Sequence, residues 1–166
     1  MSYNGYVCFK SEKGVIEGFT GDKFKTADGK SVENMSLILG FNHPLHRDYH
    51  MDTGEPQGES HKETHVTIQA DASVAELYKA LCKQQRFDEV KFYFFSEGSG
   101  DRGGSKTDMK KHNAFTLTMM GARLTHMNLQ KHPGADETVS LTFRATAHRY
   151  EDHDSKQESD HDSLKD

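Results

Sequence analysis

Histidine is the residue type in this 166-residue chain with the most evident capacity for chemistry. The chain has eleven histidines, and five of them fall between residues 43 and 65. Imidazole nitrogens bind zinc, but a zinc site needs three or four ligands that converge on one ion. His61 and His65 on one strand would lie roughly 13 Å apart, which is too far to share an ion. The spacing therefore predicts no metal site, and a metal-dependent module stays an alternative.

Two other features approach catalytic or nucleotide-binding motifs without matching them. Residues 100–107 (GDRGGSKT) resemble a phosphate-binding loop, but that motif needs Gly directly before Lys, where this chain has Ser105. Cys8 and Cys82 lack metal-ligand spacing, and we expect free, mostly buried thiols. No Gly-x-Ser-x-Gly segment offers a serine nucleophile. We therefore expect no catalytic residue and no cofactor, with an enzymatic β-barrel module as the alternative.

The charge of the chain is unevenly distributed. The formal net charge is −5, and residues 151–166, with seven acids and two lysines, account for all of it. A formally neutral body over residues 1–150 excludes a basic nucleic-acid binder. The sequence contains no run of 18 apolar residues that would predict a membrane span, and its N-terminus does not resemble a secretory signal. We expect one domain over 1–150 and an acidic, disordered tail over 151–166.

Alternating apolar residues predict strands along most of the chain. The strands expected from this pattern cover residues 6–9, 14–20, 33–41, 65–69, 90–95, 115–125 and 138–147. Segments 90–95 and 115–120 carry apolar residues on both faces, so we expect one face on the core and the other on a partner. Residues 42–60 contain Pro and Gly and almost no aliphatic residues, and we expect a long loop there.

One helix is expected over about residues 73–84. Ser73 and Glu76 have the spacing of a capping box, in which Ser is the N-cap. The apolar face that the helical period predicts contains Val74, Leu77, Tyr78 and Leu81. Many strands and a single helix predict a mainly β fold, a small β-barrel or two packed antiparallel sheets with the helix at the side.

The order of these segments resembles the hemolysin-coregulated protein (Hcp) family, the tube subunits of type VI secretion systems. The family's helix has the form Ser-Pro-x-Leu-Tyr-x-Ala-Leu, and residues 73–81 read SVAELYKAL. A Val-x-Phe-x-Phe strand follows at 90–94, and the final family strand is matched by ETVSLTFRATAH at 137–148. Val74 replaces the usual Pro, and His148 replaces the usual final aromatic residue.

The resemblance implies a structural role with no enzymatic activity. Family members form hexameric rings that stack into a tube inside a contractile sheath, tipped by a spike, and the ring channel carries small effector proteins. The implied partners are other copies, spike and sheath proteins and small effectors, with no nucleic acid and no membrane insertion. The protein would be assembled in the bacterial cytoplasm and then secreted by the machine. A phage-type tail tube protein, which shares this architecture, is the nearest alternative.

The resemblance also assigns a role to the long loop at 42–60. The family has an extended loop with a Gly-x-Pro-x-Gly-like element, which residues 54–58 (GEPQG) match. By the resemblance this loop contacts the neighbouring ring or protomer. The candidate residues for that contact are Leu45, Asp48, Met51, Gly54, Pro56 and Gly58.

Overall fold

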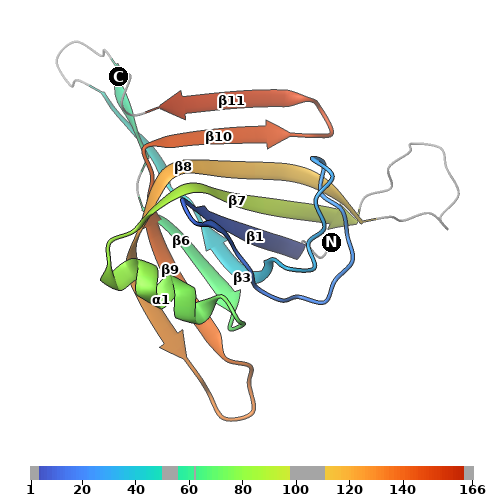
Figure 1. The fold of residues 1–166 in the computed structure, drawn as a ribbon. Coiled ribbons are helices and arrows are strands. Elements are labelled where there is room, and N and C mark those ends of the chain that lie inside the picture. Colours follow the sequence, from blue (N-terminus) through green and yellow to red (C-terminus); the bar gives the residue numbers. More distant parts are fainter. Residues whose placement is uncertain (1–3, 50–55, 62, 98–110, 163–166) are drawn as a thin grey trace, which may run out of the picture.

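A closed antiparallel β-barrel forms the centre of the molecule (Figure 1). The structure, a computed structural model, describes residues 4–49, 56–61, 63–97 and 111–162. Six strands close the barrel in the order β8-β7-β1-β3-β6-β9, and β9 pairs back onto β8. Two further strands, β10 and β11, extend the sheet outward from β8. The expected mainly β fold with one helix at its side is thus confirmed.

The elements follow one another with short connections over most of the described chain. The first half comprises β1 (Asn4–Ser11), β2 (Gly14–Ile16), β3 (Ser36–Asn42), β4 (Leu45–Tyr49), β5 (Pro56–His61) and β6 (Thr64–Gln69). The second half comprises α1 (Val74–Cys82), β7 (Arg86–Glu97), β8 (Lys111–Gln130), β9 (Thr138–Arg144), β10 (Ala147–Asp152) and β11 (Gln157–Asp162).

Strand β8 changes its pairing partner at Gly121. Before this glycine, residues 115–120 pair with β10, and after it, residues 123–130 pair with β9 on the same edge. Gly121 has φ +60°, and a Cβ added there would lie 2.5 Å from Thr146 Oγ1 and 2.9 Å from a guanidinium nitrogen of Arg86. Glycine tolerates this backbone conformation and this close approach, whereas other residues are strained by both. One strand thereby joins the barrel wall to the outer hairpin.

The barrel core combines aliphatic side chains with a cluster of phenylalanine rings. Phe9 stacks on Phe143 with ring centroids 5.9 Å apart, and Phe87 lies 6.1 Å from Phe9 and 6.0 Å from Phe143. All three side chains are buried. Burial of each contributes about 1.5–3 kcal/mol to the free energy of unfolding. A chain that is only 33% hydrophobic thus still forms a buried core inside the barrel.

A second apolar layer covers the outward face of β1 and β7. Tyr6, Tyr93 and Phe95 on these strands pack against Val32 and Met35 from the segment between β2 and β3, which we call the covering segment. Tyr6 and Phe95 meet edge to face at 5.4 Å. The expectation that the second face of 90–95 contacts a partner is therefore wrong, because the chain's own residues cover it.

The helix and the covering segment are fixed by one carboxylate. Asp71 accepts hydrogen bonds from the Ser73 hydroxyl at 2.5 Å and from the Ser36 hydroxyl at 2.8 Å. It also accepts one from the amide of Phe19 at 3.2 Å. Ser73 stands at the N-cap but makes no side-chain capping bond, so the capping box is not formed. The hydroxyl binds the nearby carboxylate instead.

Helix α1 buries a narrower face than its sequence suggests. Leu77 is fully buried and Ala80 nearly so, whereas Tyr78 is 62% exposed. Tyr78 belongs to the predicted apolar face but stays exposed, because the barrel covers only part of that face. Val74 and Leu81 are half-buried at the margin of the contact.

Two segments expected to be irregular form hairpins. Residues 45–49 and 56–61, which lie inside the expected long loop except for residue 61, pair as β4 and β5. Residues 157–162 of the expected disordered tail pair with β10, and the tail boundary at residue 150 falls inside β10. Asp152 organises the turn between β10 and β11. Its carboxylate accepts hydrogen bonds from the backbone amides of Asp154 and Ser155. These bonds, the one from the Ser155 amide foremost, lower the pKa of Asp152.

Substitution of Gly121 tests the partner switch in β8. Gly121→Ala should lower the free energy of unfolding by about 2–4 kcal/mol, because it adds left-handed strain and a clash with Thr146. Gly134→Ala is the matched control, since Gly134 also has positive φ but no atom within 4 Å of an added Cβ. It should cost only about 1–2 kcal/mol. Urea unfolding measures the free energy of unfolding of both variants. Equal decreases for the two would contradict the role assigned to the close approach at Gly121.

Candidate functional site

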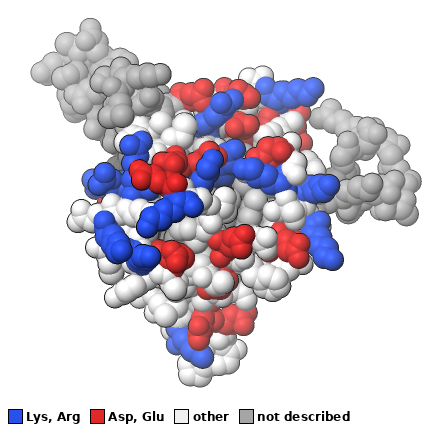
Figure 2. Space-filling model, in the orientation of Figure 1, with Lys and Arg blue, Asp and Glu red and all other residues white. Residues whose placement is uncertain are grey.

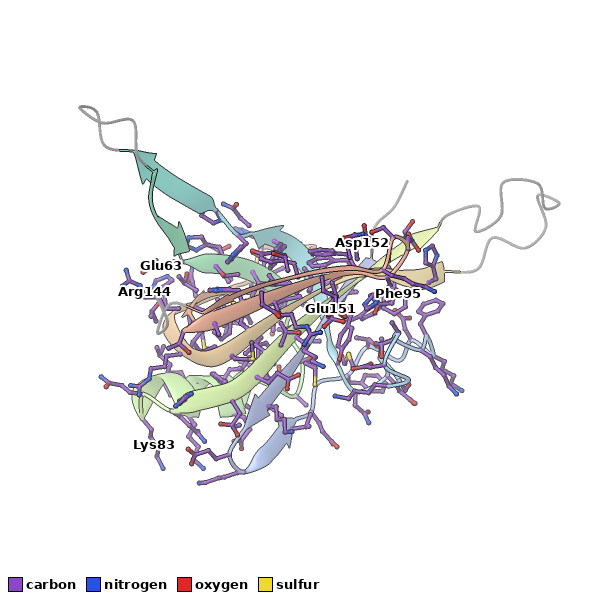
Figure 3. All side chains as sticks on the ribbon, turned by 90° about the horizontal axis from the view of Figure 1, so that it is seen from above. Glu63, Lys83, Phe95, Arg144, Glu151 and Asp152 are labelled. Carbon is purple, nitrogen blue, oxygen red and sulfur yellow. The ribbon has the colours of Figure 1, made fainter. Side chains whose placement is uncertain are left out.

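The residues predicted for contacts between copies lie on a β-arm. We define the β-arm as β4 and β5, a two-stranded sheet separate from the barrel sheet. Figure 3 shows it projecting away from the barrel wall. Leu45 and Asp48 stand on β4, Pro56 and Gly58 stand on β5, and Met51 and Gly54 lie outside the described residues. The structure thus brings four of the six candidates onto one projecting element.

The base of the β-arm is anchored to the barrel. His43 and Thr64, next to its two strands, are joined by a 2.5 Å hydrogen bond between Nδ1 and Oγ1. The His43 ring also lies 4.9 Å from the ring of His148 on β10. On the other side, Glu63 pairs with Arg144 at 2.9 Å. These contacts set the direction in which the arm leaves the barrel.

An open apolar groove of about 690 Å³ lies between α1 and the end of β8. Val74, Tyr78 and Leu81 line one side, and Met127 and Leu129 line the other. Tyr78 and Leu129 are 62% and 56% exposed. Such concave apolar surfaces on soluble proteins are typical of contact sites. No pattern in the sequence indicates this groove, because its two sides lie far apart along the chain.

An uncharged polar grid covers the outward face of β6, β9 and β8. Register pairs His65 with Thr142 and Thr142 with His126, and the same alignment repeats at the two following rows. The other members of the grid are Thr67, Ser140 and Asn128 in the second row and Gln69, Thr138 and Gln130 in the third. His65 Nδ1 and Thr142 Oγ1 lie 3.0 Å apart. None of the nine carries a carboxylate, ammonium or guanidinium group, which makes this face unlike the rest of the outer wall.

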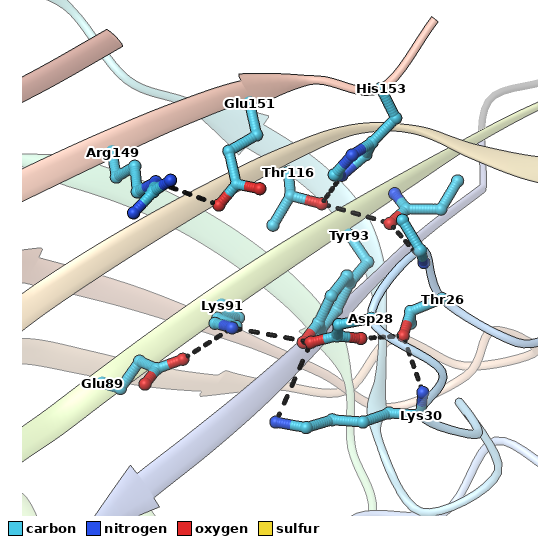
Figure 4. Close-up of polar contacts among 12 residues, drawn as sticks. Thr26, Asp28, Lys30, Glu89, Lys91, Tyr93, Thr116, Arg149, Glu151 and His153 are labelled. Carbon is cyan, nitrogen blue, oxygen red and sulfur yellow. Dashed lines mark hydrogen bonds and ion pairs between the residues drawn. The ribbon is translucent and has the colours of Figure 1, made fainter. Parts of the chain in front are cut away.

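A group of charged side chains lies on β7 beside the second apolar layer (Figure 4). Asp28 accepts hydrogen bonds from Tyr93 at 2.9 Å and from Thr26, and it lies 3.5 Å from Lys91. Burial alone would raise the pKa of Asp28, but the two hydrogen bonds and the charges of Lys91 and Lys30 outweigh it. Its pKa therefore lies below the ordinary value. Burial and the Asp28 charge together raise the pKa of Tyr93.

The hairpin of β10 and β11 carries a cluster of acids around one arginine. Arg149 lies 2.6 Å from Glu158, 3.3 Å from Glu151 and 3.6 Å from Asp160. The charge of Glu158, followed by those of Glu151 and Asp160, raises the pKa of Arg149. Figure 2 shows acidic side chains along this edge of the molecule. Three carboxylates share one guanidinium, which leaves an excess of negative charge on this face.

The described residues contain no three His, Cys, Asp or Glu side chains placed to hold a metal ion. Cys8 is half-buried, and burial raises the pKa of its thiol. Cys82 is exposed, so the expectation of mostly buried thiols is wrong for that residue. The phosphate-loop-like residues 100–107 lie outside the described residues. Within the described chain, no helix is both long and apolar enough to span a membrane.

Comparisons with known proteins identify the class. The family described as "Type VI secretion system effector, Hcp" matches residues 15–150. No curated protein matches the chain significantly. A variant of Hcp1 from E. coli EAEC 042 has a similar structure, with 18% sequence identity, a TM-score of 0.76, and coverage of 98% of this chain and 99% of that one.

Further solved structures show the same fold. Hcp3 from Pseudomonas aeruginosa has 16% identity and a TM-score of 0.71, covering 97% of this chain and 98% of that one. A type VI secretion system effector from Yersinia pestis has 12% identity and a TM-score of 0.67, covering 95% and 98%. The chain has the architecture of a secretion tube protein, and it belongs to the Hcp family of type VI secretion systems. The phage-tail and enzymatic alternatives are not favoured.

Removing the Asp28 carboxylate tests how firmly the covering segment is held. Asp28→Asn should lower the free energy of unfolding at pH 7 by about 1–2 kcal/mol, a value reduced for the partial exposure of the site. The pKa of Asp28 is depressed in the folded state. The contribution of Asp28 to the free energy of unfolding is therefore complete above the pKa of the unfolded state, about 3.9. It is lost as the pH falls through the lower pKa of the folded state.

The pH dependence provides the check on this explanation. The difference in free energy of unfolding between the native chain and Asp28→Asn should be constant from pH 7 to about pH 5 and should shrink below about pH 4. Asp136→Asn is the control, because Asp136 lies in the exposed β8–β9 turn and makes no ion pair with the described residues. A difference for Asp28→Asn that stays constant down to pH 3 would contradict an electrostatic cause.

Proposed function

We propose that this chain is a structural tube subunit that forms hexameric rings and stacks them into a tube expelled by a type VI secretion system. The observation that carries the proposal is the family match over residues 15–150, which spans nearly the whole barrel. A closed ring needs two different complementary surfaces on each copy, and stacking needs a further pair. The β-arm, the apolar groove and the charged hairpin provide distinct surfaces of this kind.

The β-arm is proposed to contact the neighbouring ring or protomer. Leu45, Asp48, Pro56 and Gly58 lie on its strands, and the arm's anchored base holds them away from the barrel. A projecting two-stranded element reaches a second copy more readily than residues on the barrel wall. Met51 and Gly54 keep the same proposed role.

The polar grid is proposed to face the ring channel. A wall that lets varied cargo pass should bind no single charge or apolar side chain strongly. Hydroxyl, amide and imidazole groups meet this requirement, and the grid contains only these groups. The proposed partners are other copies of the chain, spike and sheath proteins, and small effector proteins in the channel. We propose assembly inside the bacterial cell followed by secretion, with no enzymatic role.

Electron microscopy of the purified protein tests the ring proposal directly. Negative-stain images should show rings with a central hole, and native mass spectrometry should give six times the mass of the 18.8 kDa chain. A reconstruction should place β6 and β9 at the inner circumference. A sample that contains monomers alone at high concentration would contradict ring formation. Rings with the polar grid at the outer circumference would contradict the channel assignment.

Shortening the β-arm tests its role separately from ring closure. A variant in which Asn-Gly joins His43 to Glu63 should still form rings, because the barrel strands remain, but should stack into markedly shorter tubes. Tube length in micrographs at matched protein concentration is the measurement. A matched control replaces residues 131–136 of the exposed β8–β9 turn with Asn-Gly. Tubes of native length from the β-arm variant would refute a stacking role.

A further inference from the structure

Three arginines lie in one row across three neighbouring strands. Register places Arg86 of β7 opposite Arg123 of β8, and Arg123 opposite Arg144 of β9. Residues directly opposite in an antiparallel pair project to the same face, with their Cβ atoms about 5 Å apart. All three are exposed. We call Arg86, Arg123 and Arg144 the arginine row.

The arginine row is unfavourable within an isolated chain. Like charges directly opposite one another destabilise a sheet, and here the arrangement occurs twice in succession. Only Arg144 has an ion-pair partner among the described residues, Glu63 at 2.9 Å. Its side chain nevertheless remains 72% exposed. The described part of the chain thus leaves most of this positive charge uncompensated.

The position of Arg86 is fixed by the partner switch in β8. A Cβ on Gly121 would lie 2.9 Å from one guanidinium nitrogen of Arg86 and 3.3 Å from another. The guanidinium therefore lies over the glycine, where no side chain displaces it. Figure 2 shows basic side chains gathered at the left margin of the face, the side where β7 begins. The arginine row is consequently a positioned basic surface.

The complementary charge is present elsewhere on the same chain. Residues 149–160 contain five acids and two basic residues. Glu158 and Asp160 on β11 have side chains that are 56% and 68% exposed, and they share Arg149 with Glu151. No described ion pair joins this acidic hairpin to the arginine row of the same copy. The two surfaces are therefore available to meet between copies.

We propose that the arginine row of one copy binds the acidic β10–β11 hairpin of a neighbouring copy. The inference rests on the proposed self-assembly and names the surfaces that meet. Contacts between opposite charges fix register and accelerate association. Because the two surfaces differ, the contact is heterologous and can repeat from copy to copy. It also explains why an otherwise neutral body carries its excess acid in a folded hairpin.

Charge reversal tests the pairing. Arg86→Glu with Arg123→Glu should raise the protein concentration for half-assembly by about tenfold or more, because carboxylates then face carboxylates. Glu158→Lys with Asp160→Lys should have a similar effect. The chain carrying all four substitutions should recover assembly to within about threefold of the native value, since opposite charges meet again. Analytical ultracentrifugation measures the assembly at about 0.05 M and 0.5 M salt.

Controls separate this contact from a change in net charge or folding. Lys23→Glu with Lys25→Glu shifts the net charge as the arginine variant does but lies in the covering segment, and it should assemble normally. Circular dichroism should show that every variant is folded. High salt should weaken native assembly and reduce the difference between native and reversed chains, because screening acts on exposed charges.

The outcomes distinguish this inference from the proposed function. Failure of the native chain to assemble at all would contradict the proposed function, whatever the variants do. If the native chain forms rings and neither charge reversal weakens assembly, the proposed charge pairing is overturned, but the proposed function is not. Loss from the arginine reversal without rescue by the four-substitution chain would also overturn it, and would indicate another acidic partner for the row. Recovery in the four-substitution chain supports the pairing.

Discussion

The close approach at Gly121 is the constraint on which the rest of the structure depends. Its positive φ lets β8 leave β10 and continue along β9, so that one strand belongs to both the barrel and the outer hairpin. The barrel closes only because β9 pairs with the later half of β8. The outer hairpin is attached only because β10 pairs with the earlier half. A single backbone conformation thus connects the barrel core to the charged edge and also creates the space that Arg86 occupies.

The barrel wall has three chemically different outward faces, and their separation is what a tube subunit needs. On β1 and β7 the chain covers its own aromatic residues and seals them with Asp28, so this face is closed by internal contacts. On β6 and on β9 as far as Thr142, the outward face carries the polar grid. Between them, at the start of β7, the middle of β8 and the end of β9, lies the arginine row. Three surfaces of different chemistry are therefore available for different contacts.

The regular periodicity of the sequence made many strands and the helix predictable. Contacts between segments far apart in the sequence could not be predicted in this way. Segments 65–69 and 90–95 alternate and form strands, and residues 74–81 follow the helical period and form α1. The β-arm and β11 were predicted to be irregular because they have few aliphatic residues, yet backbone bonds hold β11 to β10 without burial. The packing of Val32 near Tyr93 joins segments far apart in the sequence, and the covering segment has no periodic pattern. The β-arm candidates followed from the family resemblance, but the arginine row depends on register across three strands.

A folded acidic hairpin differs from a disordered acidic tail in what it can recognise. A mobile tail presents an average negative field, which favours solubility but fixes no geometry. Arg149 offsets the repulsion among its acidic neighbours, which lets an acidic segment remain a strand. On this strand Glu158 and Asp160 stand two positions apart and project to the same face. The arginine row is likewise spaced by the sheet. Under the proposed pairing, two oppositely charged rows with spacings set by a sheet can align in one register, whereas a disordered tail would neutralise the arginines without orienting the copies.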